Sequence, residues 1–123
     1  MLFRSLEAIF VIYKICSDAL WRELQITGQT LGSTDDERDG FIHFSTAAQV
    51  LGTFEKYFRS EFESGSALWL LSVDPELLEP NSLQYEASRR DDLFPHLYAP
   101  LSLAQVVNAR EILAVPMDFT CLA

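Results

Sequence analysis

The chain has 123 residues, a length that suits one domain built around one hydrophobic core. Hydrophobic residues make up 49% of the sequence, which excludes the composition typical of disordered chains. Eighteen acidic residues against nine basic ones give a formal net charge of -9, which opposes extended binding to nucleic-acid backbones or to anionic membranes. A small-molecule nucleotide or a phosphorylated RNA end, bound in a local pocket, is compatible with this charge.

The cysteine content indicates a reduced, cytoplasmic protein without a metal. Cys16 and Cys121 form neither a closely spaced metal pair nor a disulfide framework, and two histidines are too few for a structural zinc site. Residues 1–9 lack regular patterning, and Glu7 interrupts their apolar run, so they predict neither a secretory signal nor a membrane span. We expect a poorly specified lead-in over residues 1–9 and a single domain over residues 10–123.

The first regular elements are a strand and a helix. Residues 10–16, FVIYKIC, are rich in β-branched and aromatic types and predict a strand, with Lys14 on the face opposite its neighbours. A helix should follow, with Ser17 as its cap and Gly28 at its end. Residues 28–40 hold three glycines and five charged residues, which predicts an exposed loop and a candidate for a mobile flap.

The next segment, GFIHFS at residues 40–45, contains one of the two histidines. Alternation along a strand places Phe41, His43 and Ser45 on one face. The histidine therefore points the same way as the serine.

A second helix is predicted directly after this strand, over about residues 47–59. Thr46 and Gln49 have the spacing of a capping box, and apolar residues then recur at helical intervals. The first turn of a helix presents unpaired N–H groups that attract anions. We expect His43 and Ser45 to lie just outside this positive end.

Two further strands follow. Residues 67–74, ALWLLSVD, form a continuous apolar run, which is typical of a strand buried on both faces and central in its sheet. Residues 82–88, SLQYEAS, alternate in polarity and place Glu86 on the polar face.

The second histidine lies in FPHLYAP, residues 94–100. Its prolines favour an extended, rigid loop or an edge strand, in which His96 and Tyr98 project in similar directions. A last strand is predicted over residues 106–115. Helices and strands mix without regular alternation, which favours an α+β domain with a mostly antiparallel twisted sheet and two main helices.

These polar residues in apolar frames suggest one polar cleft, although each has a simpler interpretation. Cleft residues would be His43, Ser45, Glu86, His96 and Tyr98. Either histidine is equally typical of a buried core imidazole bonded to backbone, and the serine of a neighbour of the helix cap. The glutamate is also typical of a solvated strand face, and the tyrosine of simple packing.

Five sequence blocks resemble a known family. IYKICSDALW, RDGFIHFSTAAQV, ALWLLSVDPELL, YEAS and LFPHLYAPLSLAQVV are similar, in order and spacing, to the small bacterial family called domain of unknown function 952. The resemblance covers about residues 10–113. It implies a fold like that of ADP-ribosyltransferases, and no activity is established for the family as a group.

A fainter resemblance links FIHFST, LWLLSVDPELL and FPHLYAPLSL to the carboxy-terminal half of RNA 2'-phosphotransferases, which use NAD to remove an internal phosphate from RNA. It implies that His43 and Ser45 lie in the nucleotide cleft, with Lys14 close by. The chain departs from that pattern at residues 13–16, where YKIC replaces Tyr-His-Gly-Thr, and at residues 57–59, where YFR replaces Arg-His-Gly.

The resemblances imply NAD or an ADP-ribose-like nucleotide as the ligand and group transfer as the reaction. In that hypothesis Glu86 stabilises the positive charge that develops on the ribose when the nicotinamide bond breaks. His43 holds a ribose hydroxyl, and His96 acts as a general acid or contacts a second phosphate. The cofactor-binding set would be His43, Ser45, Thr46 beside the pyrophosphate, Lys14, and Tyr98 or Phe41 stacked on nicotinamide.

Two other hypotheses stay open. The domain could keep the cleft without the reaction and bind a nucleotide or metabolite as an accessory module, which the missing histidine and glycine of the first strand favour. A structural interaction domain without a ligand would instead make both histidines core residues.

Overall fold

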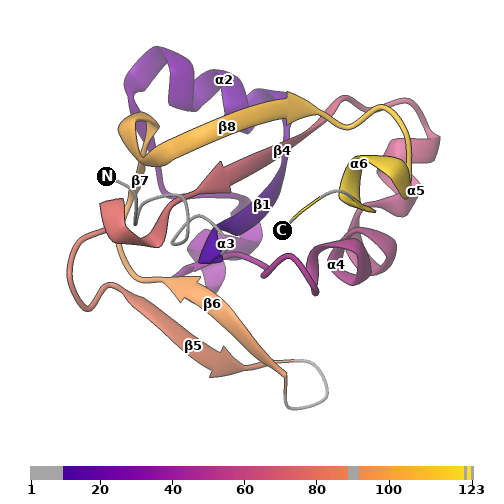
Figure 1. Cartoon of the computed structure of the whole chain (residues 1–123). Coiled ribbons are helices and arrows are strands. Elements are labelled where there is room, and N and C mark those ends of the chain that lie inside the picture. The colour runs from indigo at the N-terminus through magenta and orange to yellow at the C-terminus, as the bar shows by residue number, and fades with distance from the viewer. Residues whose placement is uncertain (1–9, 89–91, 121, 123) are drawn as a thin grey trace, which may run out of the picture.

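A computed structural model describes residues 10–88, 92–120 and 122 of the chain. The lead-in expected over residues 1–9 and the thiol of Cys121 lie outside these residues. Every strand pair of the described part is antiparallel, and helices pack around the sheets (Figure 1). The prediction of an α+β domain with mostly antiparallel pairing is confirmed.

The central sheet carries the hydrophobic core on both of its faces. Its strands, in the order β1-β4-β8, are β1 (Ile12–Ser17), β4 (Leu68–Val73) and β8 (Val106–Glu111). Strand β4 is almost entirely buried, as its continuous apolar run predicted. One core cluster includes Leu71 on one face, and a second includes Leu70 on the other.

Helix α2 (Asp18–Thr27) follows β1 directly, with the predicted caps. The Ser17 hydroxyl accepts a hydrogen bond from the N–H of Leu20, and Gly28 ends the helix with a φ of 89°. Leu20 and Leu24 are buried in the first core cluster. The helix therefore covers the face of β1 on which Lys14 also lies.

Residues 28–40 contain a short strand and a helix instead of the irregular loop expected, most of them are exposed as predicted, and a mobile flap stays a prediction. Strand β2 (Gln29–Thr30) pairs with β7 (Leu101–Ser102), and helix α3 (Thr34–Asp39) follows. Ser33 and Asp36 cap this helix reciprocally, each side chain accepting a bond from the other residue's backbone N–H. The carboxylate of Asp36 is buried, because it also serves partners outside the helix.

A second three-stranded sheet, in the order β3-β6-β5, carries both histidines. Its strands are β3 (Ile42–His43), β6 (Leu93–Leu97) and β5 (Leu83–Ala87), and the β5–β6 hairpin projects below the central sheet in Figure 1. Strand β6 is central rather than a loop or an edge, which corrects the expectation drawn from its proline. Pro95 fits there because its carbonyl accepts from the N–H of Phe44, so the ladder uses a group that proline possesses.

The helix predicted over residues 47–59 begins later and is divided. Helix α4 (Val50–Tyr57) is followed by α5 (Arg59–Glu63), and the cap residue Gln49 makes no side-chain cap bond. A turn occupies residues 47–49 instead, and β8 likewise ends at residue 111 rather than 115. The remaining short helices are η2 (Pro75–Leu77), η4 (Leu103–Gln105) and α6 (Met117–Thr120).

Candidate functional site

The two histidines lie side by side on one face of the second sheet. His43 on β3 is the register partner of His96 on β6, which in turn pairs with Gln84 on β5. Residues directly opposite each other in an antiparallel pair point to the same face. The ring centroids of the two histidines are 5.5 Å apart. They therefore share one location and do not occupy two separate core positions.

An aromatic ring joins the two imidazoles. Phe41 stacks on His96, with ring centroids 4.0 Å apart and planes inclined by 22°. The same ring lies 4.6 Å from the His43 centroid and 5.2 Å from that of Tyr98. The alternation predicted for this strand thus brings Phe41 and His43 together on the polar face.

Glu86 completes this side of the face. Its Oε1 accepts hydrogen bonds from the Tyr98 hydroxyl and from Nδ1 of His96, each over 2.7 Å. The bond from the tyrosine, together with that from the histidine, lowers the pKa of the Glu86 carboxyl, and the same bond raises the pKa of Tyr98. The glutamate is a charged acceptor that remains partly open to solvent.

A buried carboxylate that the sequence reasoning missed supports His43 from behind. Asp36 Oδ1 accepts from both the backbone N–H and the Nδ1 of His43, at 3.1 and 2.6 Å. Its Oδ2 accepts from the N–H of Ser33 at 2.8 Å and pairs with Nζ of Lys14 at 2.9 Å. Burial alone would raise the pKa of Asp36, but the bonds from His43, Lys14 and the Ser33 N–H outweigh it and hold that pKa well below its usual range.

Lys14 reaches the site, but its ammonium group binds other residues of the protein there. Its side chain is buried, and Nζ donates to the carbonyl oxygen of His43 at 3.0 Å as well as contacting Asp36. A buried ammonium needs such partners, because desolvation of an unpaired charge is costly. The lysine therefore neutralises Asp36 rather than facing a ligand.

Two of the predicted ligand-binding residues are not part of this cluster. Ser45 is buried, bridges Tyr13 of β1 through backbone bonds, and has its hydroxyl hydrogen-bonded to Thr53 of α4 at 2.8 Å. The N–H of Thr46 donates to the side-chain oxygen of Gln49. Ser45 thus lies toward the central sheet and α4 begins five residues later, while the Gln49 half of the predicted capping box is present and an anion at Thr46 stays a prediction.

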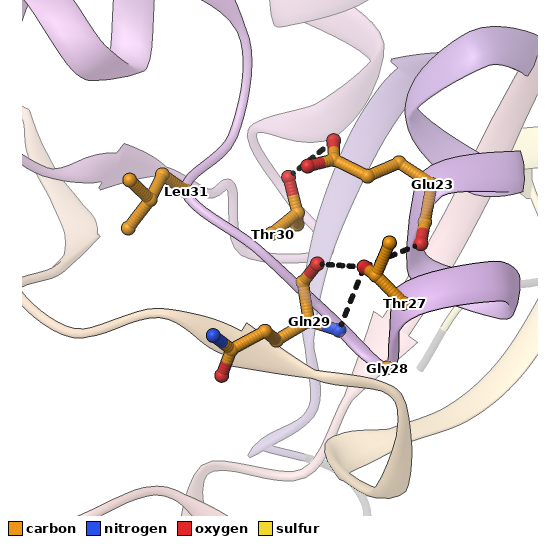
Figure 2. Close-up of a pocket in the computed structure, with 6 residues that line it drawn as sticks. All are labelled: Glu23, Thr27, Gly28, Gln29, Thr30 and Leu31. Atoms are coloured by element: carbon orange, nitrogen blue, oxygen red, sulfur yellow. Dashed lines mark hydrogen bonds between the residues drawn. The ribbon is translucent and has the colours of Figure 1, made fainter.

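A surface pocket of about 460 Å³ lies at the end of α2, away from the histidines (Figure 2). Its polar lining groups satisfy one another: the Thr30 hydroxyl donates to Glu23 at 2.9 Å, and that of Thr27 makes a bond of 2.8 Å to the carbonyl of Gln29. None of the predicted site residues lines it. The polar face, and not this pocket, therefore brings the predicted site residues together.

Three further features of the described residues concern metal binding, the free thiol and membrane insertion. No group of three or more histidine, cysteine, aspartate or glutamate side chains there is arranged to hold a metal ion. Cys16 is free, and burial raises the pKa of its thiol to about 12. No helix in the described part is long and apolar enough to cross a membrane.

Comparison with known proteins identifies the family. The family described as protein of unknown function (DUF952) matches residues 15–109. This chain belongs to the DUF952 family. A crystal structure of protein CC0527 from Caulobacter crescentus is similar to it, with 41% identity and a TM-score of 0.75 over 85% of this chain and 89% of that chain. The solution NMR structure of CC0527 has 40% identity and a TM-score of 0.67 over 81% and 82%. No curated protein matches.

Within this DUF952 protein, the cluster offers a ligand two kinds of group. His43 and Glu86 are partly exposed, whereas their partners Asp36 and His96 are buried. The exposed histidine can exchange a proton, and the exposed carboxylate can accept hydrogen bonds or stabilise positive charge. Phe41 and Tyr98 add ring surface beside them.

Proposed function

We propose that the polar face formed by Phe41, His43, Glu86, His96 and Tyr98 binds NAD or an ADP-ribose-like nucleotide. The observation that carries this proposal is the convergence of both histidines and Glu86 on one aromatic-lined face. Strands β3, β5 and β6 contribute to it, and His43 and Glu86 are partly open to solvent. The fainter resemblance of the sequence to RNA 2'-phosphotransferases supports the choice of a nucleotide, and we also propose the ADP-ribosyltransferase-like fold that the family resemblance implies.

The charges on this face favour the ribosyl end of the ligand. Among the described residues, the face carries two histidines with carboxylate partners and the phenol of Tyr98. The nearby Lys14 is paired with Asp36. Carboxylates accept hydrogen bonds from ribose hydroxyls and repel phosphates. We therefore place a ribose and its base against Phe41 and Glu86, with the pyrophosphate directed away from the face.

Transfer chemistry on this face would use the carboxylate first. Cleavage of the bond between the ribose C1' and the nicotinamide nitrogen leaves the bonding electrons on nicotinamide and positive charge on the ribose. Glu86 would stabilise that charge, and an acceptor hydroxyl or a 2'-phosphate oxygen of an RNA end would then bond to C1'. His43 would receive the proton of an attacking hydroxyl.

Binding without transfer is the second candidate, and one observation favours it. Lys14 stands in the part of the first strand where RNA 2'-phosphotransferases carry histidine and glycine, and it is buried against Asp36. The histidine that those enzymes direct at NAD is thus replaced by Lys14, whose ammonium group pairs with a buried carboxylate of the protein itself. In this version the domain is an accessory module that senses the nucleotide.

Ligand-induced stabilisation tests the proposal. A ligand that binds only the folded state raises the melting temperature by mass action. We expect NAD or ADP-ribose to raise it in the wild type and less in Glu86→Gln, while Glu79→Gln, an exposed glutamate outside the face, behaves as wild type. ADP and a 2'-phosphorylated dinucleotide identify which part of the ligand is recognised. No shift with any of the four at millimolar concentration would refute nucleotide binding.

Nicotinamide release then separates the two candidates. An enzyme releases nicotinamide from NAD, more slowly in Glu86→Gln, because the variant cannot stabilise the ribosyl cation equally well. A binding module releases none, although NAD still raises its melting temperature. An unchanged release rate in Glu86→Gln would remove the glutamate from the catalytic role.

A further inference from the structure

We propose that Asp36 is the positioning residue of the polar face: it fixes the hydrogen of the His43 ring on Nδ1, so that Nε2 is the atom His43 offers to a ligand. The inference rests on the proposed function for the identity of that ligand. The arrangement of Asp36 and His43 is a property of the protein alone and can be tested without any ligand.

Two donors of His43 share one acceptor atom of Asp36. One oxygen of Asp36 accepts from the backbone N–H of His43 and from its Nδ1, at 3.1 and 2.6 Å. An ionised carboxylate only accepts hydrogen bonds, so the hydrogen in the shorter contact belongs to Nδ1. Because the backbone and the ring are held by the same atom, the imidazole is fixed in orientation as well as in tautomer.

A second carboxylate competes for the ring from the other side. Asp39 Oδ2 lies 3.0 Å from Nε2 of His43. Its side chain is 31% exposed, whereas that of Asp36 is 2% exposed. An electrostatic contact weakens as water reaches it, and an exposed carboxylate that loses a donor is resolvated. The shorter, buried contact therefore decides which nitrogen of a neutral ring keeps the hydrogen.

The side chain of Asp36 is held in place, whereas a ligand group can take over the contact that Asp39 makes with Nε2 of His43. Asp36 is held by the Ser33 N–H and by Lys14. Asp39 ends α3, shares its carboxylate with the exposed Arg38, and is followed by Gly40. A ligand hydroxyl that approaches Nε2 can displace Asp39 toward solvent, where Arg38 still compensates its charge.

The consequence for the proposed site is a defined hydrogen-bond polarity. With the hydrogen on Nδ1, the lone pair of Nε2 accepts a hydrogen bond from a ribose hydroxyl or takes the proton of an attacking hydroxyl. The proton then resides on Nε2, and the positive ring is stabilised by Asp36. The alternative tautomer would present an N–H donor and would exclude both roles.

Nitrogen-15 NMR of the two histidine rings, at a pH where a titration shows both to be neutral, tests the inference directly. His43→Gln identifies the His43 signals, since the chain has only two histidines. We expect the Nδ1–H tautomer in the wild type and in Asp39→Asn, and a rise of the Nε2–H form in Asp36→Asn, whose amide can donate to Nδ1. The Nε2–H form in the wild type, or a tautomer unchanged by Asp36→Asn, would overturn the proposal.

The matched pair Asp36→Asn and Asp39→Asn also separates this proposal from nucleotide binding itself. We expect NAD affinity to fall about tenfold in Asp36→Asn and to change less than threefold in Asp39→Asn, because only the first alters the polarity of Nε2. Equal losses would contradict the positioning role. If wild type binds no nucleotide, the proposed function fails, and the tautomer experiment still decides the role of Asp36.

A double variant guards against simple unfolding of Asp36→Asn. In Lys14→Gln/Asp36→Asn the new glutamine can donate to the oxygen of the new asparagine, as Lys14 does to Oδ2 of Asp36, so the asparagine NH2 faces Nδ1 of His43 and no charge remains buried without a partner. We expect this protein to fold and to show the same change of tautomer. Retention of the wild-type tautomer in the folded double variant would refute the inference.

Discussion

The two histidine–carboxylate pairs of this protein are arranged in opposite ways. In the pair of His43 and Asp36 the acid is 2% exposed and the imidazole 38% exposed. In the pair of His96 and Glu86 the imidazole is 6% exposed and the acid 43% exposed. Both pairs use Nδ1, with nearly equal distances of 2.6 and 2.7 Å.

This difference shows how one hydrogen-bond type can present two different reactive groups. The partner that is buried fixes the geometry, and the partner that is exposed is the one available to the ligand that we propose. The first pair therefore presents a proton acceptor, and the second presents a negative charge. Interactions that involve the buried acid should govern stability, while those that involve the exposed acid should govern only local properties.

The largest expected effect comes from removing the buried acid. Asp36→Ala leaves the ammonium of Lys14 buried without its carboxylate, which should lower the free energy of unfolding by roughly 3–5 kcal/mol. Urea unfolding followed by circular dichroism measures the loss. Asp35→Ala, on the exposed side of the same helix, is the control and should lie within about 0.5 kcal/mol of wild type. Similar losses in both variants would contradict the contrast between the pairs.

Acid should act on the same carboxylate. The pKa of Asp36 is lower in the folded protein than in the unfolded chain, so its stabilising effect is complete above the unfolded value near 4 and is lost as the pH falls below it. Stability should therefore decrease from about pH 5 to pH 3 more steeply in wild type than in Lys14→Gln/Asp36→Asn. Parallel pH profiles of the two proteins, measured by urea unfolding, would show that Asp36 does not carry this dependence.

A glycine beside Asp36 gives a smaller, steric test. Gly32 has a φ of +97°, and a Cβ built on it would collide with Oδ2 of Asp36. Gly28 has a similar φ of +89° with open space around it, so it is the matched control. Both alanine variants should lose about 1–2 kcal/mol from the left-handed backbone, and Gly32→Ala a further 1–3 kcal/mol from displacing the carboxylate. Equal melting temperatures would indicate that the carboxylate tolerates displacement.

The exposed acid should give the smallest effect. Glu86→Gln weakens the hydrogen bond to the carboxylate, the main cause of the raised pKa of Tyr98, and removes its charge, so this pKa should fall toward its ordinary value near 10. Ultraviolet titration of phenolate formation measures the change, and Tyr98→Phe identifies the signal. The unfolding midpoint should stay unchanged, since the glutamate is solvated. A large loss of stability in Glu86→Gln would show that both acids contribute to the free energy of unfolding and would contradict the contrast between the two pairs.

Local patterns were sufficient to predict most of the strands. Alternation placed His43 and Glu86 on polar faces, and the uninterrupted apolar run of residues 67–74 identified the central strand. These inferences held because they depend on neighbours one or two positions apart. The proline of β6 misled, since the backbone group that proline lacks is not the one that binds Phe44.

The buried acid could not be singled out in the same way. Four acidic side chains occur among residues 35–39, and burial of one of them depends on Lys14, which lies 22 positions earlier. The Ser33-x-x-Asp36 spacing of a capping box was a usable signal for the helix. It does not indicate that the carboxylate also reaches β1 and β3, because those contacts arise from tertiary packing.

Lys14 has a consequence for the integrity of the domain. It connects β1 with the carbonyl of His43, which lies 29 positions later, and with Asp36 between them. The polar face and the central sheet should therefore lose structure in one cooperative transition. A fragment that begins after β1 would contain both histidines and all of their acids, yet it would lack the cation that compensates Asp36. The first strand is thus required for the folding of the polar face, although none of its side chains is offered to a ligand there.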